Sequence, residues 1–242
     1  MIPSAHSRAP FVVLGFVLCV MGVAFMSNKT NVLFLFSDEH RQDALGCYGH
    51  DLVQTPHLDR LASEGTRFTQ AYTPSPICVP ARAALATGQY VHRTRCWSNA
   101  QAYQGTPPSW GHQLIRQGHR ADSIGKLHYR GAEYDNGFEN EILPLYVRNG
   151  TGWIKGLLRD HEAVMDVSSY TREIGPGENS YTDYDLDVTR NACDWLKEAA
   201  HSQSNKPWTL FVSWLRPHYP LTCPGEFYDL YPLAQMDQAR FL

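Results

Sequence analysis

Short apolar runs alternate with longer amphipathic stretches along most of this 242-residue chain. Residues 31–36 and 209–214 are short and mostly apolar, which is typical of parallel strands that are buried on both faces. Residues 121–124 form a third run that predicts a strand. Three strands, far apart in sequence, are therefore expected in the core.

Three amphipathic stretches between these runs predict helices. The first opens at Thr55-Pro56 and stops at Gly65, because proline suits the first turn of a helix and glycine its end. Residues 109–117 predict the second helix. Residues 185–200 predict the third, since apolar side chains recur there at helical spacing, at Val188, Ala192, Trp195 and Leu196.

The alternation of strand and helix patterns predicts an α/β domain with a largely parallel sheet flanked by helices. Residues 131–181 interrupt this alternation, because they are rich in Gly, Asn, Asp and Tyr and have no clear period. We expect this segment to be a long excursion over the edge of the sheet that carries the active site. The length of the chain fits one large domain or two small ones.

Residues 11–26 form an uninterrupted apolar run of sixteen residues behind a short segment that carries Arg8. A membrane span needs about 20 residues, so residues 1–26 fit a signal peptide better than an anchor. A start at Met26 is the other interpretation, with residues 27–30 leading into the first strand. The chain is expected to be exported or membrane-anchored in the first case and cytoplasmic in the second.

Composition narrows the function classes only a little. The net charge of -3 gives no indication of nucleic-acid binding. Six cysteines in a chain of this length do not make a disulfide scaffold. With Cys19 and Cys78 set aside, the other four allow three full pairings that the sequence cannot distinguish. We expect these cysteines to be free, small and mostly buried.

The segment from Cys78 to Arg82, Cys-Val-Pro-Ala-Arg, carries the clearest chemical signal. Pro80 suits the first turn of a helix that Gly88 ends, so Cys78 lies at or just before a helix N-terminus, where anions are favoured. Arg82 follows one helical turn later, on the same face. A buried structural cysteine beside a solvated arginine is the plainer interpretation. A phosphatase-type cysteine loop fits less well, because it has five residues between Cys and Arg.

Chemically active side chains follow each of the three predicted strands. Asp38 and Glu39 follow the first strand, Lys126 and His128 the 121–124 strand, and His218 the 209–214 strand. Ligands of open α/β sheets bind outside the carboxyl ends of the strands. One histidine after one strand is more often a structural residue. Three such strand ends together with the Cys78 helix point to an anionic ester and a divalent metal.

The chain resembles the type I sulfatases of the alkaline phosphatase superfamily, in which the motif cysteine becomes formylglycine. The resemblance covers about residues 31–231, and its motif sequences are most similar to those of the choline-sulfatase and phosphonate monoester hydrolase branch. It rests on five motifs in the family's order: residues 31–38, Thr55-Pro56-His57-Leu58-Asp59-Arg60-Leu61-Ala62, Cys78-Val79-Pro80-Ala81-Arg82 with Thr87-Gly88, Gly125-Lys126-Leu127-His128, and Arg216-Pro217-His218-Tyr219-Pro220.

The resemblance implies a role for each matching position. A formylglycine-generating enzyme would convert Cys78, whose hydrated aldehyde would attack the sulfur of a small anionic sulfate ester. The hydrated aldehyde is a diol, which Arg82 would hold, and Lys126 would bind a sulfate oxygen. Proton transfers would fall to two histidines: His128 would accept the diol proton, and His218 would lie near the leaving-group oxygen.

The implied cofactor is Ca²⁺ or Mg²⁺, held by Asp38, by the oxygen at Cys78 and, with less support from the family pattern, by Glu39. Relatives continue beyond the region of His218 and supply an Asp followed by Asn or His to this metal. No such pair follows His218 here.

We therefore expect residues 27–242 to be an incomplete N-terminal catalytic domain, with the C-terminal portion of the alkaline-phosphatase-like fold missing. Such a fragment is expected to be at best a weak enzyme and to leave apolar surface exposed at one sheet edge. A phosphate or phosphonate monoester hydrolase of the same superfamily, or an inactive truncated fragment, is the alternative to a sulfuric ester hydrolase.

Overall fold

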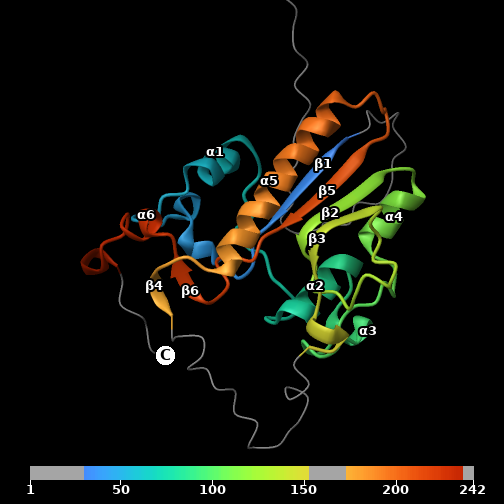
Figure 1. Cartoon of the computed structure of the whole chain (residues 1–242), viewed down its shortest axis with the longest axis horizontal. Coiled ribbons are helices and arrows are strands. Elements are labelled where there is room, and N and C mark those ends of the chain that lie inside the picture. Colours follow the sequence, from blue (N-terminus) through green and yellow to red (C-terminus); the bar gives the residue numbers. More distant parts are fainter. Residues whose placement is uncertain (1–29, 153–172, 237–242) are drawn as a thin grey trace, which may run out of the picture.

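A computed structural model describes residues 30–152 and 173–236, and within them a four-stranded, wholly parallel sheet is the centre of the fold (Figure 1). Its strands are β1 (Val32–Phe36), β2 (Arg120–Lys126), β3 (Asn140–Leu145) and β5 (Trp208–Ser213), in the spatial order β1-β5-β2-β3. A second, two-stranded parallel sheet pairs β4 (Ile174–Pro176) with β6 (Leu221–Cys223).

The helices of the described residues connect and cover these strands. The α-helices are α1 (Pro56–Glu64), α2 (Cys78–Thr87), α3 (Val91–Thr94), α4 (Trp110–Arg116), α5 (Ser180–His201) and α6 (Gly225–Tyr228). Short 3-10 helices lie at η1 (Gln42–Ala44), η2 (Gly46–Tyr48), η3 (Arg148–Gly150) and η6 (Leu233–Gln235). The predicted α/β class and largely parallel sheet are confirmed, and so are the three predicted strands and three predicted helices.

Each face of the sheet packs against different helices because side chains alternate along the strands. Phe211 lies on one face, in a cluster with residues of α2 and with the partly buried Phe34 and Trp110. The neighbouring Leu210 and Val212 lie on the opposite face, in a cluster formed with α5. Figure 1 shows α5 running along this face of the sheet.

The expectation of an irregular excursion over residues 131–181 is wrong for part of its length. Residues Asn140–Leu145 form β3, which pairs with β2 in parallel, and Ile174–Pro176 form β4. The β3 sequence conceals the strand, because Pro144 interrupts it and its burial does not alternate. Proline is tolerated there because β3 is at an edge of the described sheet. The rest of the segment includes residues 153–172, which lie outside the described residues.

Helix α5 begins five residues before the predicted start at residue 185. Its first turn carries little apolar periodicity, but the side chain of Asn179 accepts hydrogen bonds from the backbone N–H groups of Tyr181 (2.9 Å) and Thr182 (3.4 Å). An asparagine cap of this kind satisfies the first N–H groups of a helix. The cap, and not an apolar stripe, therefore determines where α5 begins.

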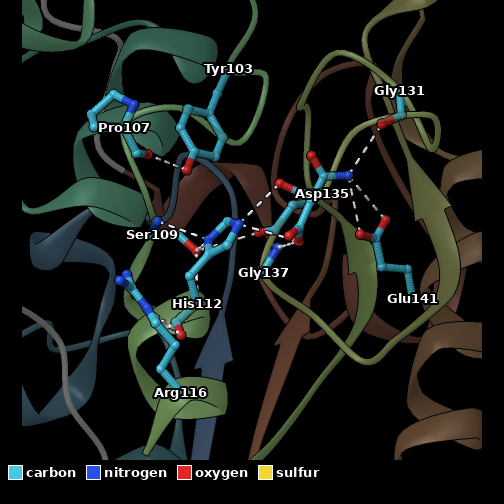
Figure 2. A network of polar contacts seen from close by, with 10 residues as sticks. Tyr103, Pro107, Ser109, His112, Arg116, Gly131, Asp135, Gly137 and Glu141 are labelled. Atoms are coloured by element: carbon cyan, nitrogen blue, oxygen red, sulfur yellow. Dashed lines mark hydrogen bonds and ion pairs between the residues drawn. The ribbon is translucent and has the colours of Figure 1, made fainter.

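The connection between β2 and β3 is fastened to the start of α4 by a polar network (Figure 2). Ser109 caps α4 and lies 2.7 Å from Nδ1 of His112, while Nε2 of His112 lies 3.1 Å from the carbonyl oxygen of Asp135. Asn136 donates to Glu141 in β3 (3.1 Å). Ser109 is 2% exposed and acts as a helix cap. This series of contacts from Ser109 through His112 to Asp135 therefore joins secondary-structure elements and is not a nucleophile site.

The described cysteines are all free, as expected, but the expectation that most are buried is wrong. Cys96 is buried, Cys193 is exposed, and Cys47, Cys78 and Cys223 are partly buried. The predicted signal or anchor segment, residues 1–26, lies outside the described residues. Within residues 30–152 and 173–236, no helix is both long and apolar enough to cross a membrane.

Candidate active site

The carboxyl ends of three neighbouring strands bring the predicted site residues together. β5 lies between β1 and β2, so Asp38 after β1, Lys126 at the end of β2 and His218 after β5 meet at one edge of the sheet. Asp38 is 7% exposed, Lys126 2% and His218 9%. Polar side chains as buried as these require partners, and their partners define the site.

Asp38 is the centre of a buried charge cluster. Its Oδ2 accepts a short hydrogen bond from Nζ of Lys126 and lies 3.6 Å from Nη2 of Arg82. Burial raises the pKa of the Asp38 carboxyl, but the charges of Arg82 and Lys126 outweigh it and hold this pKa below its usual value. The carboxylate is therefore ionised and faces two cations.

Arg82 is buried, which corrects the plainer interpretation of a solvated arginine. It projects from the middle of α2, and its Nη1 donates to the carbonyl oxygen of Lys126 (2.6 Å) and to Oγ of Ser213 (3.1 Å). The guanidinium also lies 5.0 Å from the ring centre of Phe36. Nε and Nη2 have no hydrogen-bond acceptor among the described residues. Two buried donors of Arg82 thus remain available beside the charge cluster.

Cys78 is the first residue of α2, as the sequence predicted. The N–H of Val79 next to it is bonded to Oδ1 of Asn99 (3.0 Å), which anchors this helix end. Burial raises the pKa of the Cys78 thiol, and the nearby charge of Lys126 offsets this rise only in part. Cys78 is therefore a protonated thiol at neutral pH and a poor nucleophile in its unmodified form.

His128 and His218 flank the cluster and have different surroundings. Burial, followed by the charges of Lys126 and Arg82, lowers the pKa of His128 to about 3, so its imidazole is neutral at pH 7. Its Nδ1 is buried without a partner among the described residues. His218 holds Nδ1 2.8 Å from the carbonyl oxygen of Tyr219. A carbonyl can only accept, so Nδ1 carries the hydrogen and Nε2 faces the site.

Glu39 and His128 adopt the left-handed backbone conformation, with φ of 59° and 57°. Residues other than glycine are uncommon there, and such strain often marks a functional position. Glu39 points its Oε1 to within 3.5 Å of Nε2 of His218. Its carboxylate is half-exposed, which leaves it free to take a further ligand.

The donor atoms fit a divalent cation in part. Within the described residues, Asp38, Cys78 and His218 offer ligand atoms that all lie within 4.8 Å of one another. This group contains His218, which the sequence did not mark as a ligand, while the predicted ligand Glu39 lies beside it, with Oε1 3.5 Å from Nε2 of His218. A hard cation needs six or more oxygens, and Asp38 with Glu39 supplies only some of them. The described residues thus account for part of a coordination sphere.

Sequence reasoning missed three residues that shape the site: Asn99, Ser213 and Asp185. Asn99 and Ser213 bond to α2 and to Arg82, and Asp185 bonds to the backbone after β5. Asn99 lies in a loop and has no pattern around it that marks a function. Ser213 is a polar residue near the end of the mostly apolar 209–214 run, and this position could have drawn attention to it.

Comparisons with known proteins give one consistent picture. The family model described as Sulfatase matches residues 30–240. Choline-sulfatase from Rhizobium meliloti is 31% identical over 215 residues, which cover 85% of this chain and 41% of the relative. The chain thus spans about two fifths of the length of this curated relative.

Two solved structures share the fold. A structure in complex with its substrate, D-glucosamine-2-N,6-O-disulfate, superposes with a TM-score of 0.55 at 26% identity, over 78% of this chain and 34% of that chain. The phosphonate monoester hydrolase of Agrobacterium radiobacter has a TM-score of 0.60 at 23% identity, over 87% of this chain and 45% of that chain. At that identity, the second likeness concerns the fold alone.

Proposed function

Because the chain belongs to the sulfatase family, we propose that the residues around Cys78 form the nucleophile and sulfate-binding part of a sulfuric ester hydrolase site. The observation that carries this proposal is the buried cluster of Asp38, Lys126 and Arg82 beside the N-terminus of α2. Cationic donors, a helix N-terminus and a cysteine converge there, as the binding of a tetrahedral oxyanion requires.

The nucleophile is proposed to be Cys78 after conversion to formylglycine by a formylglycine-generating enzyme. The raised pKa of the thiol argues only against the unmodified side chain as the nucleophile, because that side chain is neutral at pH 7. As a hydrated aldehyde, residue 78 would present a hydroxyl to the sulfur of the bound ester and form a covalent intermediate. The free donors of Arg82 would hold that diol.

Proton transfer is assigned to the two histidines. His128 is neutral at pH 7 and so can accept the proton that the diol loses when the sulfated intermediate breaks down. His218 directs Nε2 into the site, and with hydrogens on both ring nitrogens it would donate the Nε2 proton to the leaving-group oxygen as the ester bond breaks. Lys126 would neutralise charge on a sulfate oxygen as it develops.

The proposed metal is Ca²⁺ or Mg²⁺, held by Asp38, by the oxygen at position 78 and by Glu39. A bound cation of this kind polarises the ester and stabilises negative charge. Sulfate esters are favoured over phosphonate monoesters because the family model and the 31%-identical relative are sulfatases. The proposed substrate is accordingly a small anionic sulfate ester.

Mass spectrometry of the Cys78 peptide tests the nucleophile. Protein made in cells that contain the maturation enzyme is expected to show loss of sulfur at Cys78 and none at the exposed Cys193. Cys78→Ala should abolish hydrolysis of 4-nitrophenyl sulfate, and Cys193→Ala should leave it unchanged. An unmodified thiol at Cys78 in folded, active protein would exclude this mechanism.

A cation variant tests sulfate binding separately. Lys126→Ala is expected to lower kcat by about 10²–10³-fold, the usual cost of removing one donor that stabilises transition-state charge. Lys197→Ala is the matched control, since Lys197 is exposed on α5, where it pairs with Asp194. Equal activity of the two variants would remove Lys126 from the site.

A further inference from the structure

The segment that carries His218 is bonded to helix α5 by two charged side chains, Asp185 and Arg216. Asp185 lies near the start of α5, and Arg216 belongs to the segment itself, between the end of β5 and β6. Neither residue is needed for the proposed proton transfer or for sulfate binding. Their contacts nevertheless converge on His218.

Asp185 holds the backbone where the chain leaves β5. Its Oδ1 accepts the N–H of Leu215 and its Oδ2 accepts the N–H of Arg216, both at 2.8 Å. The N–H of Trp214 still donates to the carbonyl oxygen of Phe36 (2.9 Å), and the two oxygens of Asp185 accept the next two N–H groups of the chain. Asp185 thereby fixes the position of residues 215 and 216 relative to α5.

The backbone of His218 is bonded to the same two residues. The N–H of His218 donates to the carbonyl oxygen of Leu215 (3.0 Å), and Nη1 of Arg216 donates to the carbonyl oxygen of His218 (3.3 Å). Both backbone polar groups of His218 thus depend on the residues that Asp185 holds. A displacement of Asp185 would therefore reach His218 through one further hydrogen bond.

The guanidinium of Arg216 completes the attachment. Nη1 also donates to the carbonyl oxygen of Pro220, and Nη2 donates to the hydroxyls of Thr182 in α5 (3.2 Å) and Thr222 in β6 (3.4 Å). A planar group with donors in a fixed fork sets the relative position of several acceptors, which a lysine ammonium does not. Arg216 therefore fixes the turn around His218 against both α5 and β6.

The Asp185 carboxyl is partly buried, and this burial carries a cost that an apolar side chain would avoid. Burial raises its pKa, and the N–H groups of Leu215 and Arg216 offset that rise only in part. A side chain chosen only for packing would be apolar at this place on α5. The carboxylate is better explained by the orientation of the segment it holds.

We propose that Asp185 and Arg216 are positioning residues that fix the direction of His218 Nε2 toward the site. This proposal rests on the proposed function for the role of His218 in leaving-group protonation. Neither residue touches the substrate in this arrangement, and both act through the backbone of residues 215–218.

The first test does not depend on catalysis. Amide hydrogen exchange of Leu215 and Arg216, and the ring signals of His218, would be followed by NMR in Asp185→Asn and Arg216→Lys. Loss of one buried hydrogen bond should speed exchange of the affected amides by roughly fivefold to tenfold and shift the His218 ring signals. Asp183→Asn and Arg190→Lys, both exposed on α5, are the matched controls and should change neither.

The second test measures kcat and KM for sulfate esters of alcohols with graded acidity. Misplacement of His218 should lower kcat about tenfold or more for poor leaving groups, change it little for 4-nitrophenyl sulfate, and leave KM nearly constant. A general loss of stability would lower activity equally for all esters.

Unchanged amide hydrogen exchange and unchanged His218 ring signals in both variants would overturn the positioning role. A loss of kcat that is equal for all leaving groups would also overturn it. If the unaltered protein hydrolyses no sulfate ester, the proposed function fails. The exchange and ring-signal measurements then still decide whether Asp185 and Arg216 position His218.

Discussion

At the scale of single residues, the site is organised by opposite charges that are buried together. Asp38, Lys126 and Arg82 are each under one tenth exposed, and none could be buried alone without a large desolvation cost. Their mutual contacts reduce that cost and keep each group in one place. The cluster is thus formed without a ligand, and the proposed binding of an anion would require little reorganisation.

The neutral state of His128 predicts a dependence of stability on pH. Its pKa is about 3 in the folded chain against an ordinary value of 6.5, so below pH 6.5 the unfolded chain binds a proton that the folded chain does not. The free energy of unfolding should therefore fall by about 2 kcal/mol between pH 7 and pH 5 through this residue. Urea unfolding with a chelator present measures it.

The comparison that isolates His128 is the variant His128→Gln, in which this part of the decline should vanish. His57→Gln, at an exposed position in α1, should keep the full decline. Identical pH profiles for the two variants would contradict a buried neutral imidazole at position 128.

At the scale of elements, the order of the strands explains why distant residues meet. β5 pairs with β1 through Val32↔Thr209 and with β2 through Ala121↔Thr209, so β5 aligns the ends of its two neighbours. Lys126 and the segment after Phe36 then leave the sheet at the same level. The helices add the remaining parts, since α2 brings Cys78 and Arg82 and α5 brings Asp185.

The opposite end of β2 is held by a buried carboxylate, which gives a prediction about stability alone. Asp122 accepts hydrogen bonds from Arg120, Asn140 and Trp195 and is fully buried. Asp122→Ala should lower the free energy of unfolding by about 3 kcal/mol, because the indole N–H of Trp195 and the amide of Asn140 lose their acceptor. Urea denaturation measures the change.

Asp194→Ala is the control for that experiment, since Asp194 is exposed and pairs with the exposed Lys197. Its effect should stay within about 1 kcal/mol. The Asp122 variant should retain the charge cluster around Asp38, because position 122 lies toward the start of the strand and Lys126 at its end. A variant as stable as the control would show that the network contributes nothing.

Whether the sequence predicted a residue or an element depended on the kind of sequence pattern that marks it. Lys126, His128 and His218 were found because each follows an apolar run, and strand ends in α/β sheets share one edge. β3 was missed because Pro144 breaks its pattern. Asn99 and Asp185 were missed because they act on backbone N–H groups of residues far away in sequence. Such contacts leave no periodicity and exist only in the folded chain.

At the scale of the whole molecule, the described residues form one parallel sheet with a smaller sheet beside it (Figure 1). β1 lies at an edge of the described sheet, and Leu35 on it is 38% exposed. Further exposed apolar side chains gather around the small sheet and α6, at Ile174, Leu221, Phe227, Leu230 and Leu233.

Cysteine accessibility provides a test of the global arrangement. Iodoacetamide at pH 7.5 should modify the exposed Cys193 first and the buried Cys96 last, because burial limits access and raises the pKa of the Cys96 thiol. Peptide mapping by mass spectrometry gives the rate at each cysteine. Addition of urea should bring the rates together at the unfolding midpoint. Equal rates for Cys96 and Cys193 in native protein would contradict the fold around α2 and α3.

The central place of β5 also sets an order of events during synthesis. Residues 208–213 must leave the ribosome before β1 and β2 can be joined, so the site cannot assemble until then. At about 5–20 residues per second, the stretch from Cys78 to Ser213 takes on the order of ten seconds to make. During that interval Cys78 lies in a segment that the later site does not yet enclose. With the proposed conversion of Cys78, the strand order would give the converting enzyme a period of access to this residue that ends when β5 inserts.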